Sequence, residues 1–213
     1  MPIDLPPITR NLLIANGVVY LLQMLIGDQL VILFALWPLG PERLIQGGGT
    51  VGFEIWQLLT YGFMHGDLTH LLFNMLALWM FGGAIERLFG SRPFLIYYLS
   101  CVVGAAIAQL LVIKFFTGGF YPTVGASGGV FGLLLAFGMM FPHQRIMLLF
   151  PPIPMPAWVF VTGYGAIELF LGVTGTQSGV AHFAHLGGMA AGFIIIQYWR
   201  GKLPIKPRRI LTR

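Results

Sequence analysis

Two side chains far apart in the chain, Ser127 and His185, have the types and the placement of a nucleophile and its base. Each lies in an apolar stretch, and Pro142 follows Ser127 at the same spacing, 15 residues, at which Arg200 follows His185. At about 1.5 Å per helical residue, both side chains lie roughly 22 Å from the same face of a hydrocarbon layer about 30 Å thick. A hydroxyl and an imidazole at one depth predict acyl transfer, in which neutral His185 takes the proton of Ser127 and returns it to the leaving amine.

A second polar pair, His70 and Asn74, lies four residues apart in another apolar stretch and therefore on one face of a helix. Counted from Glu86, His70 lies about 24 Å from the same face, close to the depth of Ser127 and His185. One such group alone is explained equally well by a hydrogen bond between helices. Because each polar group costs about 2–3 kcal/mol in lipid, four at one depth predict a common site.

The neighbours of Ser127 suit this chemistry. Ser127 begins its helix, where unpaired backbone N–H groups and the helix dipole can hold an oxyanion. Gly125 and Gly128 allow a tight turn and the approach of a substrate backbone. Phe131, one turn later, is placed to pack on the ring of His185. The spans contain no aspartate, so we expect packing alone to orient His185.

The composition requires a membrane as solvent. Hydrophobic residues make up 57% of the 213 residues and charged residues 9%, against about 25% charged residues in soluble domains. Because backbone groups in lipid must be satisfied internally, the apolar stretches predict helices. The sequence thus predicts an all-α membrane protein with a six-helix membrane domain over 11–199, a segment 1–10 before it and a basic tail 200–213 after it. The six stretches are 11–27, 68–85, 94–113, 127–141, 157–173 and 180–199, the fourth being short.

Basic residues predict the orientation. Of the 12 lysines and arginines, all but Arg43 and Lys114 fall on one side of the predicted spans, which is expected to be cytosolic, with both termini there. The one long connection, 28–67 between the first two spans, is then an outer loop. The tail 200–213 is interpreted as an orientation signal or a contact with anionic lipid, and no nucleic-acid partner is expected.

Small residues predict where two helices meet. Gly128 and Gly132 are four apart in the fourth stretch, and Gly188 and Gly192 are four apart in the sixth. Such spacing allows close backbone contact in membranes. These faces adjoin Ser127 and His185, so they would bring the two side chains together.

With these motifs the chain resembles the rhomboid family of intramembrane serine proteases. The resemblance implies a rhomboid-like bundle with Ser127 as nucleophile, His185 as general base, and an oxyanion hole of His70, Asn74 and the Ser127 N–H. It implies a structural role for His65. The matching segments are His70-Leu71-Leu72-Phe73-Asn74, Gly83-Ala84-Ile85-Glu86 with Gly90-Ser91, Gly125-Ala126-Ser127-Gly128, and His185-Leu186-Gly187-Gly188 with Gly192.

The chain departs from the family's pattern at three positions. Trp56-Gln57 replaces a Trp-Arg pair of the outer loop, so a less firmly tied loop is expected. Phe131 replaces a tyrosine that often stacks on the histidine, which keeps the ring and loses its hydroxyl. Glu168 in the fifth stretch matches no family role. It could reach the outer interface or stabilise the bundle, and its short distance from the end of that span favours the interface.

The sequence therefore predicts an endopeptidase that cleaves single-span membrane proteins near the outer surface without metal or other cofactor. Membrane lipids are its other expected partners. A bacterial inner membrane is its expected location, with an organelle of bacterial descent as the alternative, and its substrates and oligomeric state are left open. The alternative is a catalytically silent rhomboid-like scaffold that binds transmembrane clients. A soluble hydrolase elbow around Ser127 would need a sheet. A metal transporter lined by His65, His70, His182 and His185 is the third reading.

Overall fold

The computed structural model describes residues 5–44, 49–147, 152–175, 181–205 and 207, and this part of the chain is mostly helical. Residues 1–4 and most of the tail beyond Ile205, which belong to the predicted terminal segments, lie outside the described residues. The helices are α1 (Pro7–Ile26), α2 (Asp28–Phe34), α3 (Gln57–Thr60), η1 (Tyr61–Phe63), α4 (Leu68–Ala77), η2 (Leu78–Gly82), α5 (Gly83–Phe89), α6 (Ser91–Val112), η3 (Ile113–Thr117), α7 (Ser127–Met140), α8 (Ala157–Thr174) and α9 (His182–Trp199). The described residues also form two short antiparallel strand pairs: β1 (Arg43–Leu44) with β2 (Thr50–Val51), and β3 (Arg145–Met147) with β4 (Pro154–Pro156).

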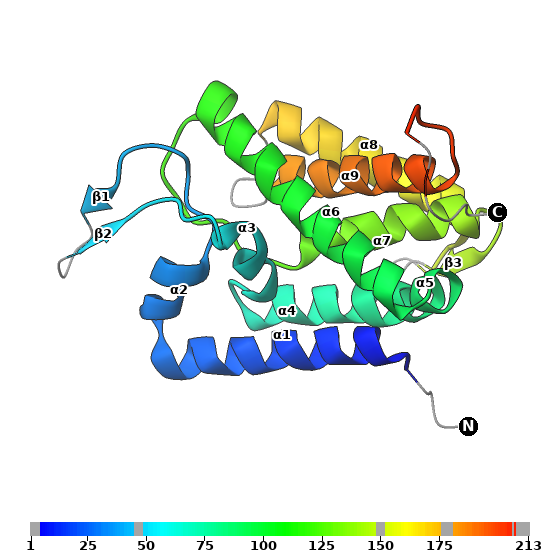
Figure 1. Ribbon diagram of the computed structural model, residues 1–213, viewed down its shortest axis with the longest axis horizontal. Helices are drawn as coiled ribbons and strands as arrows, with labels where there is room; N and C mark the ends of the chain where they lie inside the picture. The colour runs from blue at the N-terminus through cyan, green and yellow to red at the C-terminus, as the bar shows by residue number, and fades with distance from the viewer. Residues whose placement is uncertain (1–4, 45–48, 148–151, 176–180, 206, 208–213) are drawn as a thin grey trace.

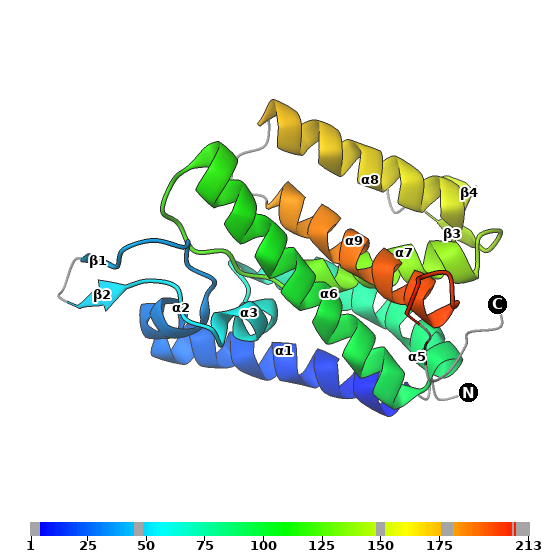
Figure 2. The same cartoon turned by 45° about the horizontal axis from the view of Figure 1, so that its top comes forward.

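The long helices alternate in direction along the chain (Figure 1). α1 and the continuous rod of α4, η2 and α5 form one side of the bundle, and α8 forms the opposite side (Figure 2). Between them α6 packs on α9 and α7, and α9 also packs on α7 and α8. Long helices that follow one another along the chain are therefore antiparallel neighbours (Figure 1).

Helix α7 is the centre of the bundle. It is 14 residues long, and most of its residues are buried, with Leu133 and Ala136 fully so. At about 1.5 Å per residue it extends roughly 21 Å, less than the thickness of a hydrocarbon layer of about 30 Å. Its first residue, Ser127, is half-buried.

Four helical segments in the described residues are long and apolar enough to cross a membrane: Pro7–Ile26, Leu68–Phe89, Ser91–Thr117 and Ala157–Thr174. Helix α7 is too short for that class, and α9 carries His182, His185 and Gln197 among its apolar residues. Of the six predicted stretches, the two outside this class are the ones that carry the predicted nucleophile and base.

Positive charge gathers where the helices meet at one end of the bundle. Arg10 lies near the start of α1, Arg87 near the end of α5, Arg92 at the start of α6 and Arg200 directly after α9. These helix ends lie together on the right in Figure 1, whereas β1, which carries Arg43, and η3, which carries Lys114, lie on the left. The described chain thus has the charge asymmetry that the sequence predicts.

The segment between α1 and α4 is tied down by a buried glutamine. The Gln57 side chain accepts a hydrogen bond from the Trp37 N–H (3.1 Å) and donates one to the Gly52 carbonyl (3.2 Å). Gln57 therefore supplies two ties within the loop, and the expectation that an arginine would tie it more firmly stays a prediction. A neutral amide can both donate and accept, so one buried side chain joins two parts of the loop.

The carboxylate of Glu86, in α5, holds three helix ends together. Its oxygens accept hydrogen bonds from the backbone N–H groups of Ile8 (3.0 Å) and Thr9 (2.7 Å), and from the hydroxyls of Thr9 (2.8 Å) and Ser91 (2.7 Å). Ile8 and Thr9 belong to the first turn of α1, whose N–H groups have no partner within the helix. Glu86 therefore fixes the starts of α1 and α6 to the end of α5.

We predict that Glu86→Gln destabilises the bundle. The amide nitrogen of glutamine would face N–H and O–H donors and leave at least one without an acceptor, at a cost of about 1–3 kcal/mol. Thermal unfolding in detergent measures this, with Glu54→Gln, which removes an exposed carboxylate, as the matched control. An equal midpoint for both variants would contradict the anchoring role.

Candidate active site

The chain enters α7 along a path that brings Ser127 to His70. Leu36 and Thr123 form an isolated antiparallel bridge, and the Gly125 N–H donates to the Tyr61 carbonyl (3.0 Å). Gly125 has φ +131°, and a Cβ there would lie 2.8 Å from Nε2 of His70 and 3.5 Å from Oγ of Ser127. Only glycine satisfies both restrictions, so Gly125 forms a tight turn next to Ser127.

Glycines bring the backbones of α7 and α9 into contact. A Cβ on Gly188 would overlap the carbonyl group of Gly128, and one on Gly128 would overlap the side chain of Ala105 in α6. One turn further, Cβ atoms on Gly132 and Gly192 would overlap Cys101 and Tyr97 of α6, respectively. The two predicted small-residue faces therefore meet, and α6 closes on both.

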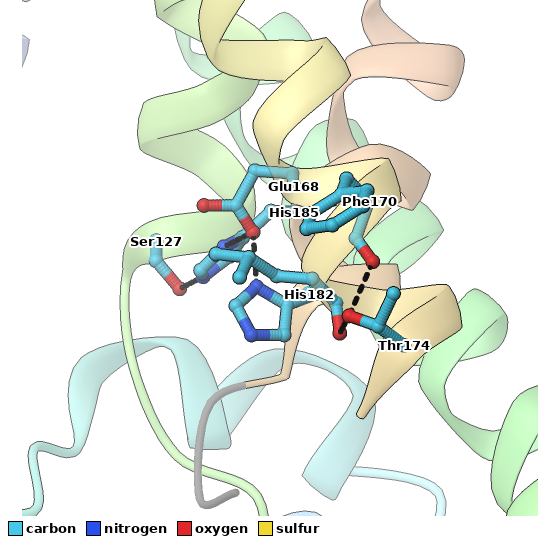
Figure 3. A network of polar contacts seen from close by, with 7 residues as sticks. Ser127, Glu168, Phe170, Thr174, His182 and His185 are labelled. Atoms are coloured by element: carbon cyan, nitrogen blue, oxygen red, sulfur yellow. Dashed lines mark hydrogen bonds and ion pairs between the residues drawn. The ribbon is translucent and has the colours of Figure 1, made fainter. Parts of the chain in front are cut away.

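The Gly128–Gly188 contact brings Ser127 and His185 together. Oγ of Ser127 and Nε2 of His185 are 2.9 Å apart, which is a hydrogen-bond distance (Figure 3). The ring of Phe131 stacks on the imidazole of His185 at a centroid distance of 4.2 Å and an interplanar angle of 7°. Of the two histidines on α9, it is His185 whose ring contacts the serine.

Glu168 on α8 contacts the other nitrogen of that imidazole. Its Oε2 lies 2.8 Å from Nδ1 of His185 and 2.7 Å from Nδ1 of His182, so one oxygen joins both rings (Figure 3). Glu168 is only 6% exposed. The prediction that Glu168 reaches the outer interface is therefore wrong, and so is the prediction that packing alone orients His185.

The sequence did contain a signal for this contact. A carboxylate in an otherwise apolar span is expected to serve a function, because lipid disfavours it. The buried residues of α8 are Ala157, Val161 and Glu168, whose spacing places them on one helical face. The position of Glu168 near the end of its span suggested an interfacial side chain, whereas the rotation of α8 turns that side chain inward.

His70 and Asn74 lie on α4, which begins with the Asp67 side chain accepting a hydrogen bond from the His70 N–H (2.8 Å). The structure places the His70 ring next to Gly125, as described above. Asn74 is buried, and its amide donates to the His70 carbonyl of its own helix (3.1 Å). His70 and Asn74 thus share one face of α4, and the ring of His70 lies beside Gly125 at the site.

The ring of His65 packs against the ring of His70. The two rings meet edge to face at 5.1 Å, and the backbone of His65 is held on both sides by the Gln23 amide, at 3.0 Å each. Burial, with a smaller effect of His70, lowers the pKa of His65 to about 4. His65 is therefore neutral at pH 7 and adds no charge beside His70.

Glu168, His182 and His185 also have the donor types that a metal ion binds, and their ligand atoms lie within 4.8 Å of one another. The two contacts to Oε2 have the length of hydrogen bonds between protonated Nδ1 atoms and a carboxylate. Such bonds leave Nε2 of His185 free to accept a proton from Ser127. This arrangement suits proton transfer to and from a hydroxyl nucleophile.

Comparison with known protein families identifies the family of this chain. The family model of the rhomboid domain matches residues 52–201, a range that includes α4, α7, α8 and α9. The chain therefore belongs to the rhomboid family and is an integral membrane protein; members of the family are generally intramembrane serine proteases. The family resemblance predicted from the motifs is confirmed.

We predict that Gly188→Ala separates α7 from α9. The added methyl overlaps a backbone carbonyl, which cannot rotate away, so we expect a cost of at least about 1–3 kcal/mol from overpacking. The measurement is thermal unfolding in detergent, combined with reactivity of Ser127 toward a fluorophosphonate. Gly163→Ala on α8 is the control, because a Cβ there meets nothing within 4 Å. Unchanged stability and reactivity of Gly188→Ala would refute the close-contact role.

Proposed function

We propose that this protein is an intramembrane serine endopeptidase in which Ser127 is the nucleophile and His185 the general base. The observation that carries the proposal is the 2.9 Å contact between Ser127 Oγ and His185 Nε2, inside the bundle of a chain that belongs to the rhomboid family. Motif residues chosen from the sequence alone are the residues that form this contact.

In the proposed reaction, Nε2 of His185 takes the proton of Ser127 while Oγ attacks the carbonyl carbon of the scissile peptide bond. The tetrahedral intermediate collapses as the C–N bond breaks, and His185 gives its proton to the leaving amine. Water, activated by the same nitrogen, then hydrolyses the acyl-enzyme and restores Ser127. Proton transfer by a positioned base contributes about 10²–10⁴-fold to such rates.

The oxyanion is proposed to lie at the start of α7. No side chain caps the N-terminus of this helix, so its first N–H groups, including that of Ser127, are available as donors. The ring of His70 lies beside Gly125, two residues before Ser127. Asn74 lies one turn after His70 on α4. Each donor of this kind is worth about 10²–10³-fold in kcat.

For the membrane we propose six crossing helices: the four apolar rods, α7 and α9. The end that bears Arg10, Arg87, Arg92 and Arg200 faces the cytosol, together with both termini, because basic residues are retained on that side. Ser127 then lies below the outer surface, where a single-span substrate can approach laterally and water can enter. A bacterial inner membrane fits this arrangement, and membrane lipids are the surrounding partners.

Two other functions remain as outcomes of the test. A scaffold that binds transmembrane clients without cleavage is the alternative, and it is not favoured because Ser127 and His185 are both present and in contact. A metal-dependent hydrolase would use Glu168, His182 and His185. The proposed reaction requires no metal or other cofactor.

The decisive experiment is cleavage of a helix-destabilised, single-span reporter in detergent and in bilayers, with a chelator present. We expect cleavage by the wild type to be unaffected by the chelator and to fall at least about 10³-fold in Ser127→Ala and His185→Ala, because nucleophile or base is lost. Ser100→Ala and His143→Ala, which change residues outside the site, are the matched controls.

Loss of cleavage with the chelator, restored by added metal, would replace the serine mechanism by a metal-dependent one. Folded wild type that cleaves none of several reporters and does not react with a fluorophosphonate would favour the scaffold.

A further inference from the structure

We propose that Glu168 is a positioning residue for His185, so that the site works as a Ser127–His185–Glu168 chain and not as a dyad. This inference rests on the proposed function and assigns the residue that holds the base in its reactive form. His182 is the second donor that keeps the carboxylate in place.

The two nitrogens of His185 must do opposite things. A neutral imidazole carries one proton, and the nitrogen without it is the acceptor. Nε2 lies 2.9 Å from Ser127 Oγ and must be the acceptor for the ring to act as base. The proton then belongs on Nδ1, which lies 2.8 Å from Oε2 of Glu168. An ionised carboxylate only accepts hydrogen bonds, so Glu168 selects the tautomer that the reaction needs.

Burial makes this contact specific. A carboxylate moved out of water loses several kcal/mol of solvation unless charges or donors replace it. The other two buried side chains of α8, Ala157 and Val161, are apolar. The donors that lie on Oε2 of Glu168 are the Nδ1 atoms of His182 and His185. Glu168 thus forms a polar junction between α8 and α9.

Stacking and hydrogen bonding fix different movements of His185. Phe131 lies parallel to the imidazole and fixes the plane of the ring. A ring can still turn within that plane and carry Nε2 away from Ser127. The contact of Nδ1 with Glu168, on the side away from Ser127, prevents this turn. Both restraints are needed to point one lone pair at the hydroxyl.

His182 completes the arrangement from one turn earlier on α9. Its Nδ1 lies 2.7 Å from the same oxygen, and its ring stands nearly perpendicular to that of His185, at 86°. Its Nε2 is buried and has no hydrogen-bond partner among the described residues, so the contact with Glu168 is what fixes this ring. When His185 becomes a cation during acylation, the carboxylate is already in place beside it.

The kinetic test compares Glu168→Gln, Glu168→Asp and His182→Gln with the wild type, and Glu54→Gln is the control for loss of a carboxylate. We expect Glu168→Gln to lower kcat about 10²–10⁴-fold with little change in KM, because an amide nitrogen facing Nδ1 favours the wrong tautomer. The rate of fluorophosphonate reaction at Ser127 should fall in parallel. Glu168→Asp should recover part of the loss, and His182→Gln should lose less than Glu168→Gln.

A second readout needs no substrate. In Ser127→Ala labelled with ¹⁵N-histidine, NMR shifts report which ring nitrogen of His185 carries the proton, and the signal is assigned by its loss in His185→Gln. We expect Nδ1–H in the parent and a population of Nε2–H after Glu168→Gln. A merely structural role for Glu168 would not move this equilibrium in a folded protein.

The outcomes separate the two proposals. Wild-type kcat in Glu168→Gln, with Ser127→Ala inactive, would overturn the positioning role and leave the protease intact. Loss of activity only in proportion to loss of folded protein would overturn it as well. If the wild type cleaves nothing, the proposed function fails, and the tautomer of His185 still decides whether Glu168 positions it.

Discussion

The contact between the backbones of α7 and α9 at Gly128 and Gly188 sets the geometry on which the site depends. A methyl added at Gly188 would overlap the carbonyl of Gly128 in α7, and one added at Gly128 would overlap Ala105 of α6. The backbones of α7 and α9 are therefore in direct contact at this point. Ser127 and His185 lie directly beside this contact and are 2.9 Å apart as a result. In lipid, where apolar side chains gain nothing from leaving the solvent, such close packing is itself a main source of helix association. The same glycines thus support both the fold and the candidate chemistry.

Two buried carboxylates, Glu86 and Glu168, join helices at opposite levels of an otherwise apolar bundle. Each is satisfied by groups from other helices: Glu86 by Ile8, Thr9 and Ser91, and Glu168 by two histidines of α9. Such groups are costly when a partner is removed, because a charge then remains without its donors. The difference lies in the donors. Backbone and hydroxyl groups make Glu86 a fixed anchor, whereas imidazoles connect Glu168 to a group that can gain and lose a proton.

Much of this arrangement could be predicted from the sequence, for reasons that particular residues make clear. Hydropathy located the helices because lipid imposes one rule on every span, and motif spacing indicated the pairing of Ser127 with His185. The ends of the helices were less predictable. The helices of the second and third stretches continue to Phe89 and Thr117, because polar residues at a membrane surface do not stop a helix. The contacts of Glu168 and Gln57 could not be predicted, because they depend on how α8 is rotated and how a loop folds back.

Helix α8 is attached to the rest of the bundle by little apolar contact. Of its 18 residues, only Ala157, Val161 and Glu168 are buried, and large apolar side chains such as Phe170 and Val173 remain exposed. A small displacement of this helix would break both of the contacts that Glu168 makes with α9. The thickness of the surrounding bilayer acts on such a lipid-exposed helix, so we expect the lipid composition of the host membrane to affect how firmly the ring of His185 is held.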